Sequence, residues 1–150
     1  MYVHYNRTLR KRTKGAYVTT LHAINSGIIK LSKQTKACTV YRGVAGGVLP
    51  EQFWTPNEHG VRGGIEGAFM STTTDRAVAM QYAASGGRGL VFEIQQGMID
   101  RGADIGWLSQ FPGEEEILYG PLTGLEVCGA RAVGATLLPP AQCGLPLISR

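Results

Sequence analysis

Long apolar runs, a leader peptide and paired cysteines are all missing from this sequence. No stretch approaches the roughly 18 consecutive apolar residues that a membrane-spanning helix needs. Residues 1–9 are polar and aromatic and lack the apolar segment of a signal peptide. We therefore expect no membrane span, and a cytoplasmic location is favoured. The sequence is equally compatible with a fragment of a longer chain, for which a missing leader would say little about the compartment.

Cysteine is too scarce to build a framework. The three cysteines, Cys38, Cys128 and Cys143, form no C-x-x-C pair, and their number is odd. A disulfide scaffold and a zinc site are therefore not expected, and we predict no metal. Cys38 and Cys128 fall within predicted strands, where we expect them to be small buried apolar residues.

Acidic residues are absent from the first part of the chain. Residues 1–36 carry eight Lys or Arg and no Asp or Glu, a charge of +8, while the remainder carries seven basic and eleven acidic residues, a charge of −4. This asymmetry favours an anionic partner, which could be the phosphate of a ligand, an acidic protein or nucleic acid. The alternative is a solvated helix face.

The remaining composition is that of a single globular domain. The chain has 150 residues, of which 43% are hydrophobic, and it contains 21 glycines. A chain of this length can form a hydrophobic core without the help of disulfides or metals, and the glycines indicate many turns. We expect one domain over residues 1–150. Residues 139–150 show little hydrophobic pattern, and we expect them to form a tail.

The hydrophobic periodicity predicts a mixture of helices and short strands. Helices are predicted at 1–14, at 18–33 and from an N-cap at Thr74 or Asp75 to Ala84. Strands are predicted at 37–43, 68–72 and 89–94, with a short strand at 103–105, a strand that Glu114-Glu115-Glu116 opens, and a closing hairpin at 124–138. Residues 44–67 form a long connection.

Arg42 is out of place in its predicted strand. Alternation puts Cys38, Val40 and Arg42 on one face, so a guanidinium follows two residues of a buried type. A buried guanidinium requires a partner, and phosphate or carboxylate fits its geometry. The alternative is an arginine at the exposed end of the strand.

Three consecutive acids, Glu114, Glu115 and Glu116, stand between a Pro-Gly turn and an apolar strand. Side chains on a strand alternate faces, so Glu114 and Glu116 share one face. Two carboxylates at this spacing can point into one cleft and take different roles. The alternative is a solvated strand edge.

Taken in order, three segments resemble the Arg, Ser-Thr-Ser and Glu-x-Glu motifs of the arginine-specific mono-ADP-ribosyltransferases. The segments are Tyr41-Arg42-Gly43, Phe69-Met70-Ser71-Thr72-Thr73 and Glu114-Glu115-Glu116, with threonine in place of the second serine. The resemblance runs from about residue 9 to 127. It implies an α+β fold with N-terminal helices, two mainly antiparallel sheets and an NAD cleft between the sheets.

The resemblance also implies the residues that bind NAD. Arg42 would bind the phosphate and ribose oxygens, and the backbone of Gly43 would hold the nicotinamide carboxamide. Ser71 would orient the catalytic glutamate, and Thr72 would shape the cleft. Tyr82, on the helix that follows, is a candidate for stacking on nicotinamide, with core packing as the alternative.

By the same resemblance Glu116 is the catalytic acid, which stabilises the oxocarbenium-like ribose as nicotinamide leaves. Glu114 would orient the acceptor arginine and relieve it of a proton. Residues 101–113 resemble the family's acceptor-recognition loop, in which Phe111 and Trp107 would contact the protein substrate. Both aromatics could equally be loop anchors.

The implied function is transfer of ADP-ribose from NAD to an arginine of a target protein. The alternatives are an NAD glycohydrolase, with water as acceptor, and a catalytically silent binding module. A related branch of the superfamily has a histidine at the position that Arg42 occupies in this sequence. Polymer-forming activity, which belongs to that branch, is therefore not expected. A monomer is favoured, with NAD and the target protein as partners and nucleic acid unexpected.

Overall fold

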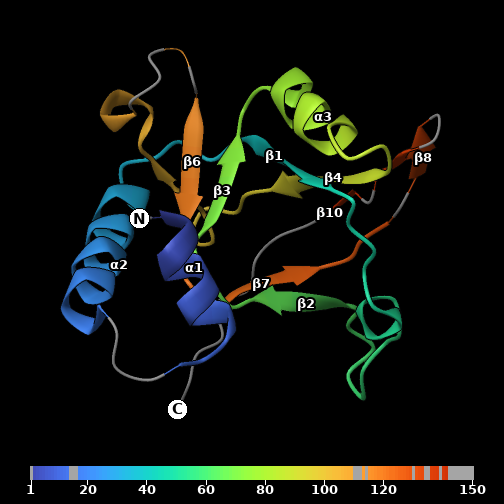
Figure 1. Cartoon of the computed structure of the whole chain (residues 1–150), viewed down its shortest axis with the longest axis horizontal. Coiled ribbons are helices and arrows are strands. Elements are labelled where there is room, and N and C mark those ends of the chain that lie inside the picture. The colour runs from blue at the N-terminus through green and yellow to red at the C-terminus, as the bar shows by residue number, and fades with distance from the viewer. Residues whose placement is uncertain are drawn as a thin grey trace.

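Three α-helices are seen in the computed structural model, which describes residues 2–13, 17–109, 113, 115–129, 131–133, 136–138 and 140–141. They are α1 (Tyr2–Arg10), α2 (Val18–Ser32) and α3 (Arg76–Ala84), with 3-10 turns η1 (Glu51–Phe53) and η2 (Gly106–Leu108) (Figure 1). All three predicted helices are confirmed, although α1 ends earlier than expected. None of the described helices has the length and apolar character to cross a membrane.

Within the described residues the strands form two sheets. The strands are β1 (Thr39–Ala45), β2 (Gly63–Glu66), β3 (Met70–Thr73), β4 (Gly89–Gln95), β5 (Ala103–Asp104), β6 (Glu116–Tyr119), β7 (Thr123–Glu126), β8 (Arg131–Val133), β9 (Thr136–Leu138) and β10 (Pro140–Ala141). The larger sheet has the order β5-β6-β3-β1-β4-β9-β8, with β10 also beside β4, and the smaller sheet pairs β2 with β7. Most pairs are antiparallel, so the predicted α+β architecture is confirmed.

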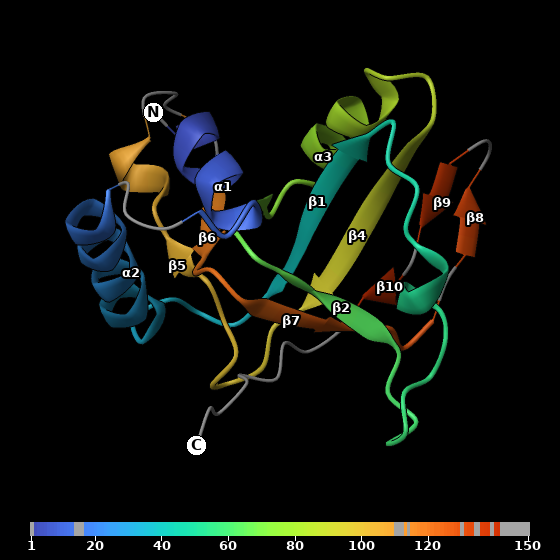
Figure 2. The ribbon, with the colours of Figure 1, turned by 60° about the horizontal axis from the view of Figure 1, so that its bottom comes forward.

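The centre of the larger sheet is the long pair of β1 and β4, which run side by side in Figure 2. The two strands pair without a break from Thr39 opposite Gln95 to Ala45 opposite Gly89. Both faces of β4 are covered, which explains its almost continuous apolar sequence. This rigid pair carries Arg42 and Gly43 in its middle.

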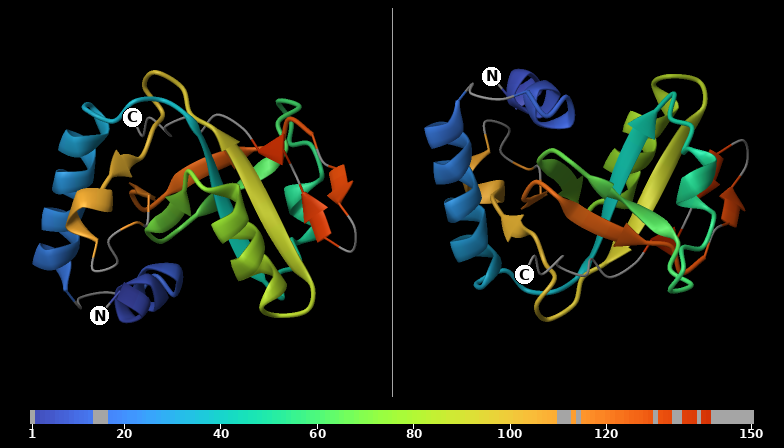
Figure 3. Two further views of the ribbon diagram at one scale, coloured as in Figure 1. Left: turned by 90° about the horizontal axis from the view of Figure 1, so that it is seen from above. Right: turned by 90° about the horizontal axis from the view of Figure 1, so that it is seen from below.

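The core is divided into three clusters by the layers. The cluster between the two sheets contains Val40, Phe53, Met70, Phe92, Ile94, Ile117, Tyr119 and Val127. A second cluster lies under α2, around Ile28, Phe69, Ala103 and Leu118, and a third lies under α3, around Ala79, Ala83 and Val91. Figure 3 shows α2 beside β5, and α3 along β1 and β4.

Two predictions about the strands were wrong. The segment 44–67, predicted to be a long connection, contains β2, which pairs with β7. A Cβ at Gly63 would lie 1.9 Å from the carbonyl oxygen of Leu125, so glycine there permits the close pairing of β2 with β7. The hairpin predicted at 124–138 is shorter in the structure. It consists of β8 and β9, because β7 pairs with β2 in the smaller sheet.

The cysteines and the tail differ from expectation as well. Cys38 and Cys128 lie just outside strands and are exposed, so neither is a small core residue. Cys143 lies outside the described residues. The tail predicted at 139–150 is likewise outside them, apart from 140–141, which form β10 parallel to β4.

The start of α3 is fixed by Asp75, as predicted. Its side chain accepts a hydrogen bond of 2.7 Å from the backbone N–H of Ala77 and satisfies a donor that the first helical turn leaves free. The cap therefore sets where β3 ends and where α3 turns back over the sheet.

Replacing Asp75 with alanine is expected to lower the free energy of unfolding by about 1 kcal/mol, because the capping acceptor is lost. Urea unfolding followed by circular dichroism measures this. The control is Asp75→Asn, which keeps an acceptor and is expected to stay within a few tenths of a kcal/mol of the parent. Equal losses in the two variants would show that the carboxylate charge, and not the cap, is responsible.

Candidate active site

A cavity of about 440 Å³ opens between α1, β1, β3, α3 and the start of β6. Its lining contains six of the nine residues that were predicted as site residues, namely Arg42, Gly43, Ser71, Thr72, Tyr82 and Glu116. These residues are far apart along the chain, and the antiparallel order β6-β3-β1 brings them together. The structure therefore places them in one crevice, while their roles remain predictions.

Ser71 and Glu116 are joined directly. The Ser71 hydroxyl donates a hydrogen bond of 2.6 Å to Oε1 of Glu116. The register of β3 and β6 makes this possible, since Thr73 lies opposite Glu116 and Ser71 opposite Leu118. The buried Thr72 forms a second side-chain hydrogen bond between β3 and β6, because its hydroxyl donates to the carbonyl oxygen of Ile117 at 2.7 Å. Glu116 is thus held in one orientation at the edge of the cavity.

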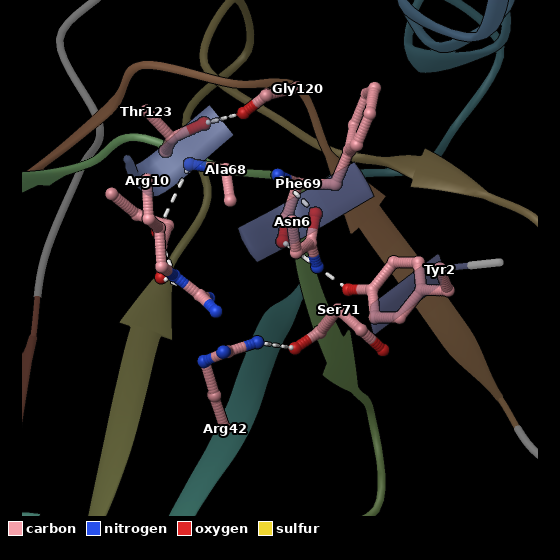
Figure 4. A network of polar contacts seen from close by, with 10 residues as sticks. Tyr2, Asn6, Arg10, Arg42, Ala68, Phe69, Ser71, Gly120 and Thr123 are labelled. Atoms are coloured by element: carbon pink, nitrogen blue, oxygen red, sulfur yellow. Dashed lines mark hydrogen bonds and ion pairs between the residues drawn. The ribbon is translucent and has the colours of Figure 1, made fainter. Parts of the chain in front are cut away.

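Arg42 reaches the same place from β1. Its Nη1 donates a hydrogen bond of 2.8 Å to the carbonyl oxygen of Ser71 (Figure 4). Burial lowers the pKa of the Arg42 guanidinium, and the nearby Tyr2 and Glu66 act in the opposite direction. Arg42 is therefore not an arginine at an exposed strand end, and its partly buried charge favours an anion in the cavity.

Gly43 has a structural role that sequence reasoning did not identify. A Cβ at this position would lie 2.0 Å from the carbonyl oxygen of Ala79 on α3. Glycine therefore lets α3 approach β1 closely, in addition to exposing backbone to the cavity.

The aromatic candidates are placed less centrally. Tyr82 lines the cavity from α3 and is 61% exposed, so the core-packing alternative is wrong and the stacking role stays a prediction. Trp107, in η2, is 71% exposed and is not among the residues that line the cavity. It is therefore not a buried loop anchor. Phe111 and Glu114 lie outside the described residues.

Sequence reasoning missed the wall that α1 contributes. Tyr2, Asn6 and Arg10 recur every four residues and line the cavity from this helix. Asn6 is buried and forms two hydrogen bonds with the backbone of Phe69, from Nδ2 to the carbonyl oxygen at 3.3 Å and from the Phe69 N–H to Oδ1 at 3.2 Å (Figure 4). The four-residue spacing could have revealed this polar stripe.

Metal-binding side chains are not gathered in the part of the site that the structure describes. Among the described residues no group of three or more His, Cys, Asp or Glu is arranged to hold a metal ion. The histidines His4, His22 and His59 are all exposed. The chemistry that the described side chains can supply is therefore that of a guanidinium, hydroxyls and carboxylates.

The arrangement suits an anionic ligand that carries a sugar. The Arg42 guanidinium and the Glu116 carboxylate line one cavity, and each is hydrogen-bonded to Ser71. The guanidinium can bind phosphate, and the carboxylate can accept from a ribose hydroxyl and stabilise positive charge that develops on the ring.

Comparison with known proteins places the chain in a family. Residues 1–137 match the family model of NAD:arginine ADP-ribosyltransferases. A comparison with curated proteins gives no match.

Solved structures share the fold. The ADP-ribosyltransferase HopU1 of Pseudomonas syringae pv. Tomato DC3000 superimposes with a TM-score of 0.74 and 24% identity, over 96% of this chain and 65% of HopU1. Vis, from Vibrio splendidus, in complex with agmatine gives a TM-score of 0.72 and 21% identity, over 97% of this chain and 69% of Vis. Exoenzyme S from Pseudomonas aeruginosa, bound to human 14-3-3 protein beta and Carba-NAD, gives a TM-score of 0.68 and 20% identity, over 94% of this chain and 66% of exoenzyme S.

This chain thus spans slightly less than two thirds of HopU1. At these identities the likeness establishes the fold, and the match to the family model over residues 1–137 establishes the relationship. The protein belongs to the NAD:arginine ADP-ribosyltransferase family, whose enzymes use NAD as a substrate, and it has the ADP-ribosyltransferase fold.

Proposed function

We propose that this protein transfers ADP-ribose from NAD to an arginine side chain of a target protein and releases nicotinamide. The observation that carries the proposal is the 2.6 Å hydrogen bond between Ser71 and Glu116 inside the cavity that Arg42 lines. The family description names arginine as acceptor, and the similar protein Vis has been crystallised with agmatine, a small guanidinium compound. Both support arginine as the acceptor.

The size and the charge of the cavity support NAD as its ligand. Its volume of about 440 Å³ lies within the range of roughly 300–1,000 Å³ that small-molecule sites occupy. Arg42 offers a guanidinium to the diphosphate, and Glu116 offers a carboxylate to the nicotinamide ribose. The similar exoenzyme S binds Carba-NAD, an NAD analogue, which supports the same use of this fold.

The chemistry requires one bond to break and one to form. The bond between the ribose C1′ and the nicotinamide nitrogen breaks, and nicotinamide leaves as a neutral molecule with the bonding electrons. The ribose becomes oxocarbenium-like, and the fixed Glu116 carboxylate stabilises this charge. A guanidine nitrogen of the acceptor then attacks C1′ as its proton passes to a base, the role assigned to Glu114.

Incubation with NAD labelled in the adenylate part, together with a mixture of proteins, tests the proposal. Transfer predicts labelled protein whose label is released by hydroxylamine, as expected of an arginine adduct. Free ADP-ribose without labelled protein would instead identify an NAD glycohydrolase. Neither product would identify a silent binding module.

Glu114→Gln is expected to reduce transfer to protein by about a hundredfold, since general base catalysis of the acceptor is lost. Hydrolysis of NAD should change by only a few-fold, because water needs no base of this kind to trap an oxocarbenium ion. Quantifying labelled protein and free ADP-ribose in the same reaction gives both rates.

Glu115→Gln is the matched control at the neighbouring position. The Glu115 carboxylate accepts a hydrogen bond from the Thr74 hydroxyl and is thereby turned toward the start of α3. The ratio of transfer to hydrolysis should stay near that of the parent. Equal loss of the two activities in Glu114→Gln would refute the assignment of Glu114 to the acceptor.

A further inference from the structure

The loop between β4 and β5 carries two neighbouring apolar side chains at its tip. Met98 is 79% exposed and Ile99 is 84% exposed. Figure 2 shows this loop, residues 96–101, projecting from the lower side of the fold. Exposed apolar residues that are scattered singly are ordinary on a protein surface. Two adjacent ones on a projecting loop form an apolar tip, which the described part of the chain leaves uncovered.

Backbone hydrogen bonds fold the loop into a turn. The N–H of Gly97 donates to the carbonyl oxygen of Asp100 at 3.3 Å, and the N–H of Arg101 donates to that of Ile99 at 3.2 Å. These two bonds close the turn around Met98 and Ile99. A partner would therefore meet a preformed tip, and binding would require little additional ordering of the loop.

Two further hydrogen bonds attach the loop and the start of β5 to the segment that follows α2. Arg101 donates from Nη2 to the carbonyl oxygen of Lys33 at 3.0 Å. The N–H of Asp104 donates to the hydroxyl of Thr35 at 2.8 Å. The apolar tip is thereby placed beside residues 30–38, which contain three lysines.

Positive charge predominates in these two adjacent segments. Residues 30–38 and 96–104 contain four basic residues, Lys30, Lys33, Lys36 and Arg101, and two acidic ones, Asp100 and Asp104. All three lysines are exposed. The Asp104 carboxylate accepts a hydrogen bond of 3.1 Å from the N–H of Gly106 and is thereby turned toward η2. The surface around the tip thus has an excess of positive charge, which attracts an anionic partner.

A bilayer that contains anionic lipids matches both features. Apolar side chains can enter the boundary of the hydrocarbon region while long basic side chains stay at the level of the headgroup phosphates. Each basic residue near such a surface strengthens binding. A fluid bilayer accepts a projecting tip without a preformed pocket, whereas an acidic protein would need a pocket that fits Met98 and Ile99. The convex shape of the tip therefore favours a lipid surface.

We propose that the 96–101 loop and the lysines of residues 30–36 form a docking surface for membranes that contain anionic lipids, with Met98 and Ile99 entering the bilayer. The protein then lies on the membrane without crossing it. Figures 2 and 3 show α1 and α3, which line the cavity, on the side of the fold opposite this loop. Docking therefore leaves the cavity uncovered. The inference concerns attachment and not chemistry, so its failure would leave the proposed function unaffected.

The test is co-sedimentation of the protein with vesicles of phosphatidylcholine, or of phosphatidylcholine mixed equally with phosphatidylserine. The parent is expected to bind the mixed vesicles at least about tenfold more strongly than the neutral ones, and to lose this preference at high salt. A parent that binds neither kind of vesicle would overturn the inference and leave the tip to a protein partner.

The double variant Met98→Ser, Ile99→Ser removes the apolar tip. It should weaken binding to the mixed vesicles by about tenfold or more, since two apolar side chains no longer enter the bilayer. Val48→Ser is the matched control, because Val48 is 91% exposed in a different loop, and it should bind as the parent does. Binding of the double variant at the parental strength would overturn the inference. The substituted side chains are all exposed, so the variants should fold, which thermal unfolding checks.

Lys33→Gln tests the basic part of the surface. It should weaken binding to the mixed vesicles by about fivefold, through the loss of one positive charge near the headgroups. Arg7→Gln is the matched control, because it removes the same charge from an exposed position of α1, and it should bind at nearly the parental strength. Equal losses in the two variants would show that the total charge, and not this surface, attracts the vesicles.

Tryptophan fluorescence reports whether the tip enters the bilayer. Ile99→Trp should be quenched by brominated phosphatidylcholine in the mixed vesicles, and Val48→Trp should not. The parent, which contains Trp54 and Trp107, gives the background. Absence of quenching in Ile99→Trp would show that the tip stays in water and would overturn the inference.

Discussion

Replacing Glu116 with glutamine is expected to slow both ADP-ribose transfer and NAD hydrolysis by about a thousandfold or more. Glutamine has the same shape, and its side-chain oxygen can still accept the 2.6 Å hydrogen bond from the Ser71 hydroxyl. What is lost is the negative charge that the proposed function assigns to the ribose from which nicotinamide leaves. Both reactions pass through that cleavage, so both should fall together.

The release of nicotinamide under single-turnover conditions measures this effect, because it reports the chemical step without product release. Glu51→Gln is the control, since Glu51 is exposed in η1 and lies outside the cavity lining. It should retain the rate of the parent. A Glu116→Gln variant within about tenfold of the parent would show that this carboxylate is not the main stabiliser of the transition state.

Part of the site could be predicted from the sequence because the side chains of a strand alternate between two faces, a pattern that is visible in the sequence. Arg42, Ser71 and Glu116 each stand in or at the start of a short strand, where alternation and flanking apolar residues indicate the face that each one occupies. Their meeting in one cavity depended on strand order. The resemblance to a family supplied that order, since no local pattern states which strands are neighbours.

The wall formed by α1 escaped prediction for a physical reason. Helical periodicity shows which residues share a side, but it does not show what the helix packs against. The spacing of Tyr2 and Tyr5 puts both on one side of a helix, yet Tyr5 is buried while Tyr2 is 44% exposed and lines the cavity. Glu66, the partner of Arg10, is 56 positions away in the sequence.

The smaller sheet was missed for a related reason. The residues of β2 are Gly63, Gly64, Ile65 and Glu66, a segment with little intrinsic preference for a strand. Its stability comes from pairing with β7, which lies about 60 positions away in the sequence, so tertiary context decides its conformation. By contrast, β4 is apolar along most of its length, and its position could be predicted locally.

Gly43 connects the packing of the fold to the shape of the cavity. Helix α3 lies so close to β1 and β4 that a Cβ at Gly43 would be 2.0 Å from the Ala79 carbonyl oxygen, and one at Gly89 would be 2.1 Å from that of Ala83. Both obstructions are backbone atoms, which cannot rotate away as a side chain could. The same helix contributes Val78, Ala79 and Tyr82 to the cavity lining.

The Gly43→Ala variant is therefore expected to lower the free energy of unfolding by about 3 kcal/mol, because one methyl group must push α3 away from the sheet. For a chain of this size the midpoint of thermal unfolding should fall by roughly 6–12 °C. Activity at a temperature where the variant is folded should fall as well, since α3 carries one wall of the cavity with it.

Gly27→Ala is the matched control, and it should act in the opposite direction. A Cβ at Gly27 meets nothing within 4 Å, and the residue lies inside α2. Alanine there should raise the free energy of unfolding by about 0.5–1 kcal/mol through its higher helix propensity. If Gly43→Ala were as stable as the parent, α3 could move without cost, and the close contact at Ala79 would not determine the shape of the cavity.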